Sequence, residues 1–149
     1  MNIEILVLPA AIVSVAGAIM DIRKRSLPNW LSAVLAITAG GGLALAAGAD
    51  ALASSALHSL LALLVGMLVF KLGMVGGGDA KFYAAAALGL PIGQALPFLG
   101  WTSLAGLLLL LVMVVGRRVV RSAEGANWSW SVPYGVAISA GFIATLFVS

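Results

Sequence analysis

The sequence predicts an all-α membrane protein, a polytopic bundle of six transmembrane helices with both termini on the non-cytoplasmic side. Three observations predict this class: the composition, the spacing of the apolar runs and the placement of the basic residues. Of the 149 residues, 62% are hydrophobic and 9% are charged, and the mean hydropathy is +1.16. Soluble domains contain about 45–50% apolar and about 25% charged residues. Because so few polar residues cannot cover a water-facing surface, we expect lipid to be the solvent.

Six apolar runs are candidates for the membrane spans. A span needs about 20 mostly apolar residues, each of which rises about 1.5 Å along the helix axis. The fourth run is short, because Pro91 and Gly93 interrupt it. No repeat, linker or second domain is evident, so residues 1–149 are predicted to form one integral membrane domain. The predicted spans are residues 3–20, 30–48, 52–70, 80–92, 95–116 and 132–148.

The first run is expected to be retained as a span. A cleavable secretory signal begins with a basic segment, followed by its apolar stretch. Here residues 1–4 contain no Lys or Arg, and the basic cluster follows the apolar run.

The eight basic residues support this number of spans independently. Lys and Arg gather in cytoplasmic loops. In this chain they lie after the first run, around the third loop and after the fifth run, which are alternate loops. This placement predicts that both termini lie outside the cytoplasm. It also explains the net charge of +3 without a nucleic-acid partner. The eight residues are Arg23, Lys24, Arg25, Lys71, Lys81, Arg117, Arg118 and Arg121.

The residue inventory excludes several kinds of active site. Cysteine is absent, which excludes disulfides, cysteine-ligated zinc and a thiol nucleophile. The single histidine, His58, cannot by itself build a histidine-rich metal site or a Ser-His-Asp triad. We therefore expect neither a metal nor a cofactor. His58 lies within the third predicted span, and we expect a structural role in which Ser54, Ser55 or Ser59 bonds its neutral imidazole.

Asp21 is the first of two acidic residues with unusual neighbours. It directly follows the first apolar run, so it lies at the edge of the membrane, where a carboxylate costs less than at the bilayer centre. Farther on, Pro28 stops a helix and biases Leu27 towards an extended conformation. Asn29 is a residue type that can cap the next helix.

Asp79 is the second acidic residue with unusual neighbours. It follows three glycines at the start of the fourth predicted helix. Gly76, Gly77 and Gly78 allow unusual backbone conformations and leave room for another chain segment to approach. The positive end of a helix favours an anion at this place. Lys81 has two open interpretations: it steers a substrate carboxylate or lowers the pKa of an aspartate, or it anchors the helix at the cytoplasmic boundary.

Under the six-span topology, Asp21 and Asp79 lie on the same side and at similar depth. Two close carboxyls do not both ionise easily, so one of them keeps its proton. The ionised carboxylate can take a proton from water, while the protonated one polarises a peptide carbonyl. This arrangement is typical of aspartyl peptide hydrolysis. Topology alone favours the simpler alternative, that each aspartate is a solvated residue at the end of a span.

Three motifs resemble those of a known family, in the right order and across nearly the whole chain. Gly76-Gly77-Gly78-Asp79 matches the GxGD motif of intramembrane aspartyl proteases, and Ala80-Lys81 extends it as in type IV prepilin peptidases. Asp21, the basic run and Leu27-Pro28-Asn29 resemble the first motif of that family, with Leu27 in place of its isoleucine. Val132-Pro133-Tyr134-Gly135 resembles a third segment.

The resemblance implies that Asp21 and Asp79 are the catalytic pair. It implies that Pro133, Tyr134 and Gly135 either shape the site or begin the last helix. The implied reaction is removal of the basic leader of a type IV prepilin at the cytoplasmic face of the bacterial inner membrane, just before the substrate's apolar helix.

The chain lacks the cytoplasmic cysteine-containing insert of longer family members and any methyl-donor site. It is therefore similar to short, peptidase-only forms that serve Flp pili of tight-adherence systems, without N-methylation. Archaeal preflagellin peptidases share the layout and are the close alternative. Presenilin-type enzymes share GxGD but have more spans. A different class of function, a small non-enzymatic transporter or assembly subunit, would use His58 and the glycine-rich breaks as a pathway.

Overall fold

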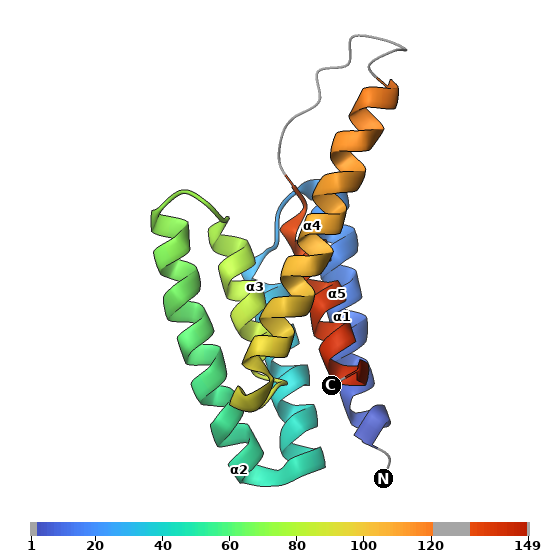
Figure 1. The fold of residues 1–149 in the computed structure, drawn as a ribbon. Coiled ribbons are helices and arrows are strands. Elements are labelled where there is room, and N and C mark those ends of the chain that lie inside the picture. The colour runs from blue at the N-terminus through green and yellow to red at the C-terminus, as the bar shows by residue number, and fades with distance from the viewer. Residues whose placement is uncertain (1–2, 121–131, 149) are drawn as a thin grey trace.

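A computed structural model of the chain describes residues 3–120 and 132–148, with side chains described for residues 6–116 and 132–148. Every regular element in these ranges is a helix, which confirms the predicted all-α class (Figure 1). The elements in chain order are α1 (Ile3–Lys24), α2 (Asn29–Lys71), α3 (Gly77–Ala87), the short 3-10 helix η1 (Ile92–Gln94), α4 (Ala95–Val120) and α5 (Tyr134–Val148).

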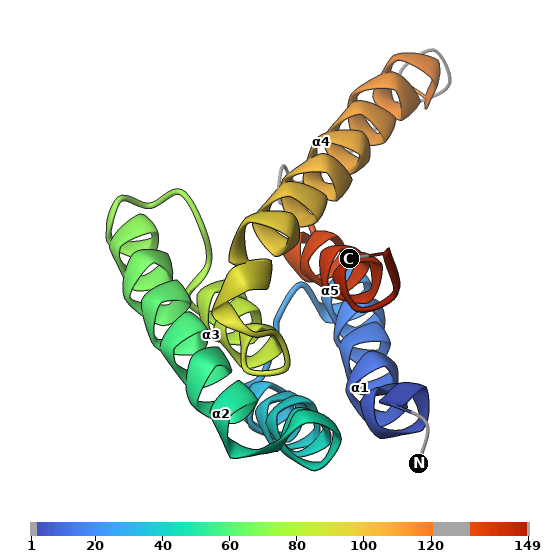
Figure 2. The same cartoon turned by 60° about the horizontal axis from the view of Figure 1, so that its bottom comes forward.

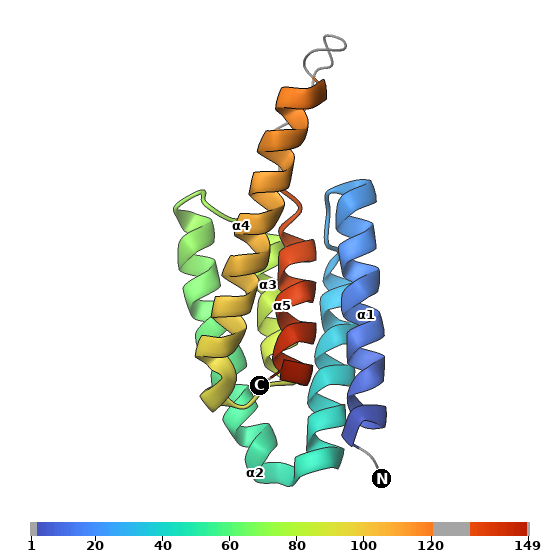
Figure 3. The same cartoon turned by 45° about the vertical axis from the view of Figure 1, so that its right-hand side comes forward.

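α2 is a helical hairpin rather than one long rod. Gly48 interrupts it with φ 83° and ψ −173°, a left-handed conformation that glycine adopts without steric cost. Residues 29–47 form a first arm and residues 49–71 a second arm. The two arms run in opposite directions (Figures 1 and 3). They correspond to the predicted segments 30–48 and 52–70.

The helix ends divide the molecule into two poles. The end of α1, both ends of α2, the start of α3, the end of α4 and the start of α5 lie at one pole, which we call the site end (Figures 1 and 3). Both described chain ends and the Gly48 turn lie at the other pole. The basic segments fall at the site end, as the alternate-loop pattern predicts, although Arg121 lies outside the described residues. In the described part of the chain, three helices are long and apolar enough to cross a membrane, namely Leu6–Lys24, Asn29–Lys71 and Ile92–Gly116.

The predicted boundaries of the fourth helix are wrong. α3 covers Gly77–Ala87, not residues 80–92. It ends early because Leu88, Gly89 and Leu90 donate their N–H groups to carbonyls three residues back, and because Pro91 disfavours helical conformation at Leu90. With 11 residues, α3 is about 16 Å long, roughly half of a bilayer's hydrocarbon core. The count of six spans therefore stays a prediction.

α3 occupies the centre of the bundle, between α2 and α5 (Figure 2). Phe82 on α3 is fully buried, and its ring packs against Gly17 of α1, where any side chain would clash. Tyr83 stacks on Phe98 of α4 with ring centroids 4.2 Å apart. Phe98 in turn meets Phe142 of α5 edge to face. These contacts fix α3, and with it Asp79 at its start.

A close helix crossing allows a test of this packing. A Cβ atom at Gly141 on α5 would lie 2.7 Å from the backbone N of Thr102 on α4 and 2.8 Å from its Cα atom. Because backbone atoms cannot rotate away, we expect Gly141→Ala to lower the stability by about 1–3 kcal/mol. A Cβ atom at Gly100 meets nothing within 4 Å, so Gly100→Ala on α4 is the control. Equal melting temperatures of the two variants in detergent would contradict this packing.

Candidate functional site

Asp21 faces the interior of the bundle. α1 continues to Lys24, four residues beyond the predicted end, so Asp21 lies on its last turns rather than after it. Its side chain is only 6% exposed, while those of Ile22, Arg23 and Lys24 are exposed. The Asp21 Oδ2 atom accepts a 2.7 Å hydrogen bond from the backbone N–H of Gly135.

The donor of this hydrogen bond sits at the start of α5. The N–H groups of a first helical turn have no partner within the helix, and the positive helix end favours an anion. The Val136 N–H bonds the Pro133 carbonyl, which closes the first turn. A Cβ atom at Gly135 would lie 2.9 Å from Asp21 Oδ2 and 3.1 Å from Leu27 Cδ1. The Pro133-Tyr134-Gly135 segment therefore both begins the last helix and contacts Asp21.

Asp79 lies on the first turn of α3. Gly76 is the extended N-cap residue, and Asp79, three residues later, accepts a hydrogen bond from the Gly76 backbone. A Cβ atom at Gly76 would lie 2.7 Å from Asp79 Oδ2, and one at Gly78 would lie 3.0 Å from the carbonyl oxygen of Leu27. A Cβ atom at Gly77 would make only ordinary contact, 3.5 Å from the Phe70 ring. The close contacts of Gly76 and Gly78 therefore explain why these two positions are glycine.

Both aspartates line one cavity of about 550 Å³ at the site end, which we call the polar cavity. Asp21 reaches it from α1 and Asp79 from α3, so the structure brings together the two acids that the sequence analysis paired. Among the described residues, no group of three His, Cys, Asp or Glu side chains could hold a metal ion. The lining residues are Asp21, Arg25, Ser26, Leu27, Met74, Gly76, Gly78, Asp79, Val132 and Tyr134.

Comparison with protein-family models identifies the family of the chain. The family model described as the type IV leader peptidase family matches residues 8–148. The chain belongs to this family. The match confirms the resemblance inferred from the three motifs and includes both aspartates. No curated protein and no solved structure matches the chain. With its long apolar helices, this member of a protease family is a membrane protein.

The carboxyl group of Asp79 has a perturbed pKa. It lies outside the apolar helices that are long enough to span. Burial, followed by the nearby charge of Asp21, raises the pKa of Asp79 from 3.8 to about 6, against the lowering effect of the Gly76 backbone hydrogen bond. Asp79 therefore holds a proton at a higher pH than an ordinary aspartate.

This pKa predicts a pH-dependent stability. Since the pKa of Asp79 is about 6 in the folded protein and 3.8 without perturbation, folding favours the protonated form. The stabilisation is complete below the lower pKa and is lost as the pH rises through the higher one. We expect the melting temperature in detergent to fall between about pH 4.5 and 7, and Asp79→Asn to weaken this dependence. An unchanged pH profile in Asp79→Asn would contradict the raised pKa.

Lys81 links the GxGD segment to the Leu27-Pro28-Asn29 segment. Its Nζ atom donates a 3.0 Å hydrogen bond to Oδ1 of Asn29, and both side chains are exposed. The prediction that Asn29 caps α2 is wrong: Pro28 occupies the cap position, and no side chain caps this end. Asn29 is instead the first helical residue, and its amide points to α3. Lys81 does not line the polar cavity; it ties α3 to the start of α2.

His58 has a structural partner other than the expected serines. Its Nδ1 atom lies 2.9 Å from the carbonyl oxygen of Leu90, so Nδ1 carries the donated proton. Ser59 donates to the Ala84 carbonyl, and Ser54 accepts from the Ile92 N–H. These three side chains of the second arm thus bond backbone groups where α3 ends. Irregular backbone at membrane depth requires such internal partners.

Arg25 is a residue of the site that was not predicted individually. In the sequence it belongs to the basic run of the first motif, and in the structure it lines the polar cavity. The Arg25 N–H bonds the Asp21 carbonyl at 2.9 Å, and its φ of 50° is left-handed. Because Arg25 lies just past the end of α1 in a left-handed conformation, the helical spacing from Asp21 does not predict where its side chain lies.

Proposed function

We propose that this leader peptidase is an aspartic endopeptidase whose catalytic residues are Asp21 and Asp79. We further propose that it removes the basic leader of a type IV, Flp-like prepilin at the cytoplasmic face of the bacterial inner membrane. The observation that carries this proposal is the shared polar cavity, which two acids far apart in the sequence reach from α1 and α3.

The surroundings of the two carboxyls suggest a division of roles. Asp79, with its pKa near 6, is the protonated partner. Asp21, held by the Gly135 N–H at a helix start, is the ionised partner. Asp21 takes a proton from water, whose oxygen attacks the scissile carbonyl carbon, and Asp79 gives its proton to the carbonyl oxygen. Collapse of the tetrahedral intermediate breaks the C–N bond, and the leaving amine takes a proton from the pair.

The absence of cysteine supports a peptidase-only form, because the insert of the longer family members contains cysteines. We therefore propose cleavage without N-methylation. Archaeal-type preflagellin cleavage is the alternative within the same chemistry, and the substrate distinguishes the two.

A reconstituted cleavage assay tests the proposal. The purified protein is incorporated into liposomes with a Flp-like prepilin or with a preflagellin, in the presence of S-adenosylmethionine, and the products are measured by mass spectrometry. We expect one cut between the leader and the apolar helix of the prepilin, and no methyl group on the new N-terminus. Preflagellin cleavage alone would favour the archaeal-type alternative. Cleavage of neither substrate, together with ion or solute flux, would support the non-enzymatic module instead.

A further inference from the structure

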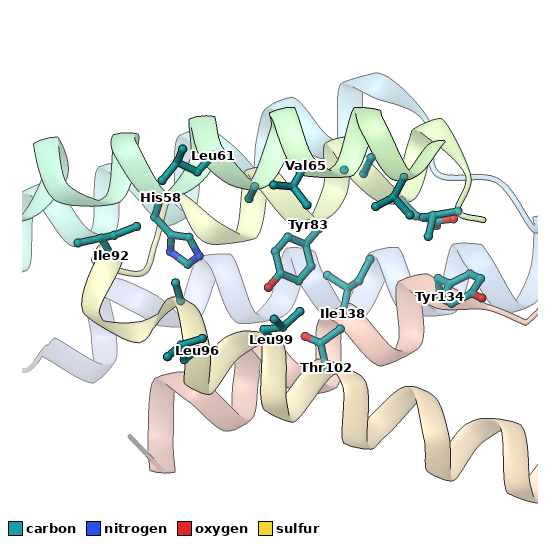
Figure 4. Close-up of a pocket in the computed structure, with 17 residues that line it drawn as sticks. His58, Leu61, Val65, Tyr83, Ile92, Leu96, Leu99, Thr102, Tyr134 and Ile138 are labelled. Carbon is teal, nitrogen blue, oxygen red and sulfur yellow. The ribbon is translucent and has the colours of Figure 1, made fainter. Parts of the chain in front are cut away.

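A second cavity extends along the bundle from Tyr134 towards His58 and Ile92 (Figure 4), and Asp79 is among its lining residues. It has a volume of about 410 Å³ and lies between the second arm of α2, α3, α4 and α5. We call it the apolar groove, because aliphatic side chains form most of its walls. Its principal wall residues are Leu61, Val65, Leu96, Leu99 and Ile138.

The apolar groove exists because α4 diverges from α2 and α3 beyond its first turns (Figure 2). Phe98 near the start of α4 stacks on Tyr83 of α3, but over most of its described length α4 packs against α5. The facing side chains are left uncovered: Val65 is 59% exposed, Leu96 79% and Leu99 53%. In a bilayer these apolar walls face lipid, so the groove is open sideways to the membrane.

The apolar groove and the polar cavity meet at the proposed catalytic site. Asp79 and Tyr134 line both of them. A peptide bond presented to Asp79 therefore has a polar compartment on one side and an apolar compartment on the other. This matches a substrate in which a polar leader is followed directly by an apolar helix.

The length and chemistry of the groove suit a helix. Its wall on α2 extends from His58 to Val69, a rise of about 16 Å, or roughly three helical turns. Ala62, Ala80 and Ala95 line it with small side chains, which let a helix approach closely.

We propose that the apolar groove binds the first three turns, approximately, of the apolar helix that follows the scissile bond of the substrate. The helix enters sideways from the bilayer while the leader occupies the polar cavity. This inference rests on the proposed peptidase function and adds the site that recognises the membrane part of the substrate.

Cysteine cross-linking tests the location of this helix. Because the chain contains no cysteine, Val65→Cys introduces a single thiol into the groove wall. Leu64→Cys is the matched control, since Leu64 is 57% exposed at the same depth but does not line the groove. Both cysteine variants also carry Asp21→Asn, which is expected to leave the substrate uncut. Asp21 lies outside the groove. The partner is the prepilin cleaved in the assay above, with one cysteine in its apolar helix. We expect a disulfide from position 65 only.

Filling the groove tests its contribution to cleavage. We expect Val65→Trp to lower kcat/KM for the whole prepilin about tenfold, mainly through KM, and Leu64→Trp to leave it within about twofold. A short peptide that spans the scissile bond but lacks the apolar helix should be cleaved equally by both variants.

The outcomes separate the two proposals. If the wild type cleaves no prepilin, the proposed function fails. If it cleaves, but positions 64 and 65 cross-link equally or not at all, the groove assignment is overturned, and lipid alone occupies the groove. An equal loss of cleavage for the prepilin and the short peptide in Val65→Trp would also overturn it, because the substitution would then act on the catalytic site.

Discussion

Asp21→Asn and Asp79→Asn are each expected to lower prepilin cleavage about a thousandfold or more, because each removes one of the two carboxyls that move protons. Asparagine keeps the size of the side chain. At position 21, its amide oxygen still accepts the hydrogen bond from Gly135, so the fold is retained. The measurement is the initial rate of leader release in liposomes, with insertion and melting temperature checked for each variant.

Asp50→Asn is the matched control for this experiment. Asp50 is an exposed acid beside the Gly48 turn, at the pole opposite the site. Its replacement should leave the rate unchanged. Wild-type activity in either Asp21→Asn or Asp79→Asn would remove the catalytic assignment, whatever the control does.

The glycines before Asp79 are expected to differ in their effect on activity. A Cβ atom at Gly76 would lie 2.7 Å from Asp79 Oδ2, so Gly76→Ala must push the carboxyl to another rotamer. Moving the end of a side chain changes the free energy of unfolding little. Misplacing a reacting group by about 1 Å, however, can lower the reaction rate about a hundredfold. We therefore expect Gly76→Ala to lose about a hundredfold in kcat while its melting temperature changes little.

Gly77→Ala is the neighbouring control. It occupies the free position of the GxGD motif, and its added Cβ atom would make only ordinary contact with Phe70. Its activity should stay close to that of the wild type. Equal rates for Gly76→Ala and Gly77→Ala would show that the close approach at Gly76 does not position Asp79.

The main features of the fold and of the candidate site could be predicted because they depend on strong local signals. Long apolar runs indicate helices in lipid, and the glycine run before Asp79 indicates a helix start. The end of α1 could not be placed, because Asp21 and the charges after it look like a loop in the sequence. In the structure the helix continues, and only Asp21 turns inward.

Other features depend on contacts between distant segments, which local patterns do not contain. The apolar groove results from the lean of α4, which follows from its packing on α5 rather than from its own sequence. The bond from His58 to the Leu90 carbonyl joins residues 32 positions apart. The serines next to His58 in the sequence were plausible partners, but their hydrogen bonds go to backbone groups.

The hydrogen bonds around the end of α3 have a mechanical consequence. Ser54, His58 and Ser59 anchor the second arm of α2 to the backbone between Ala84 and Ile92. Sliding these two elements apart would strand several backbone groups without partners in hydrocarbon, at a cost of several kcal/mol for each group. The second arm of α2 and α3 therefore move as one rigid unit. α4 meets this unit near its start, where Phe98 stacks on Tyr83 and contacts His58 edge to face. We therefore expect the part of α4 beyond Phe98 to move when a substrate helix enters from the lipid.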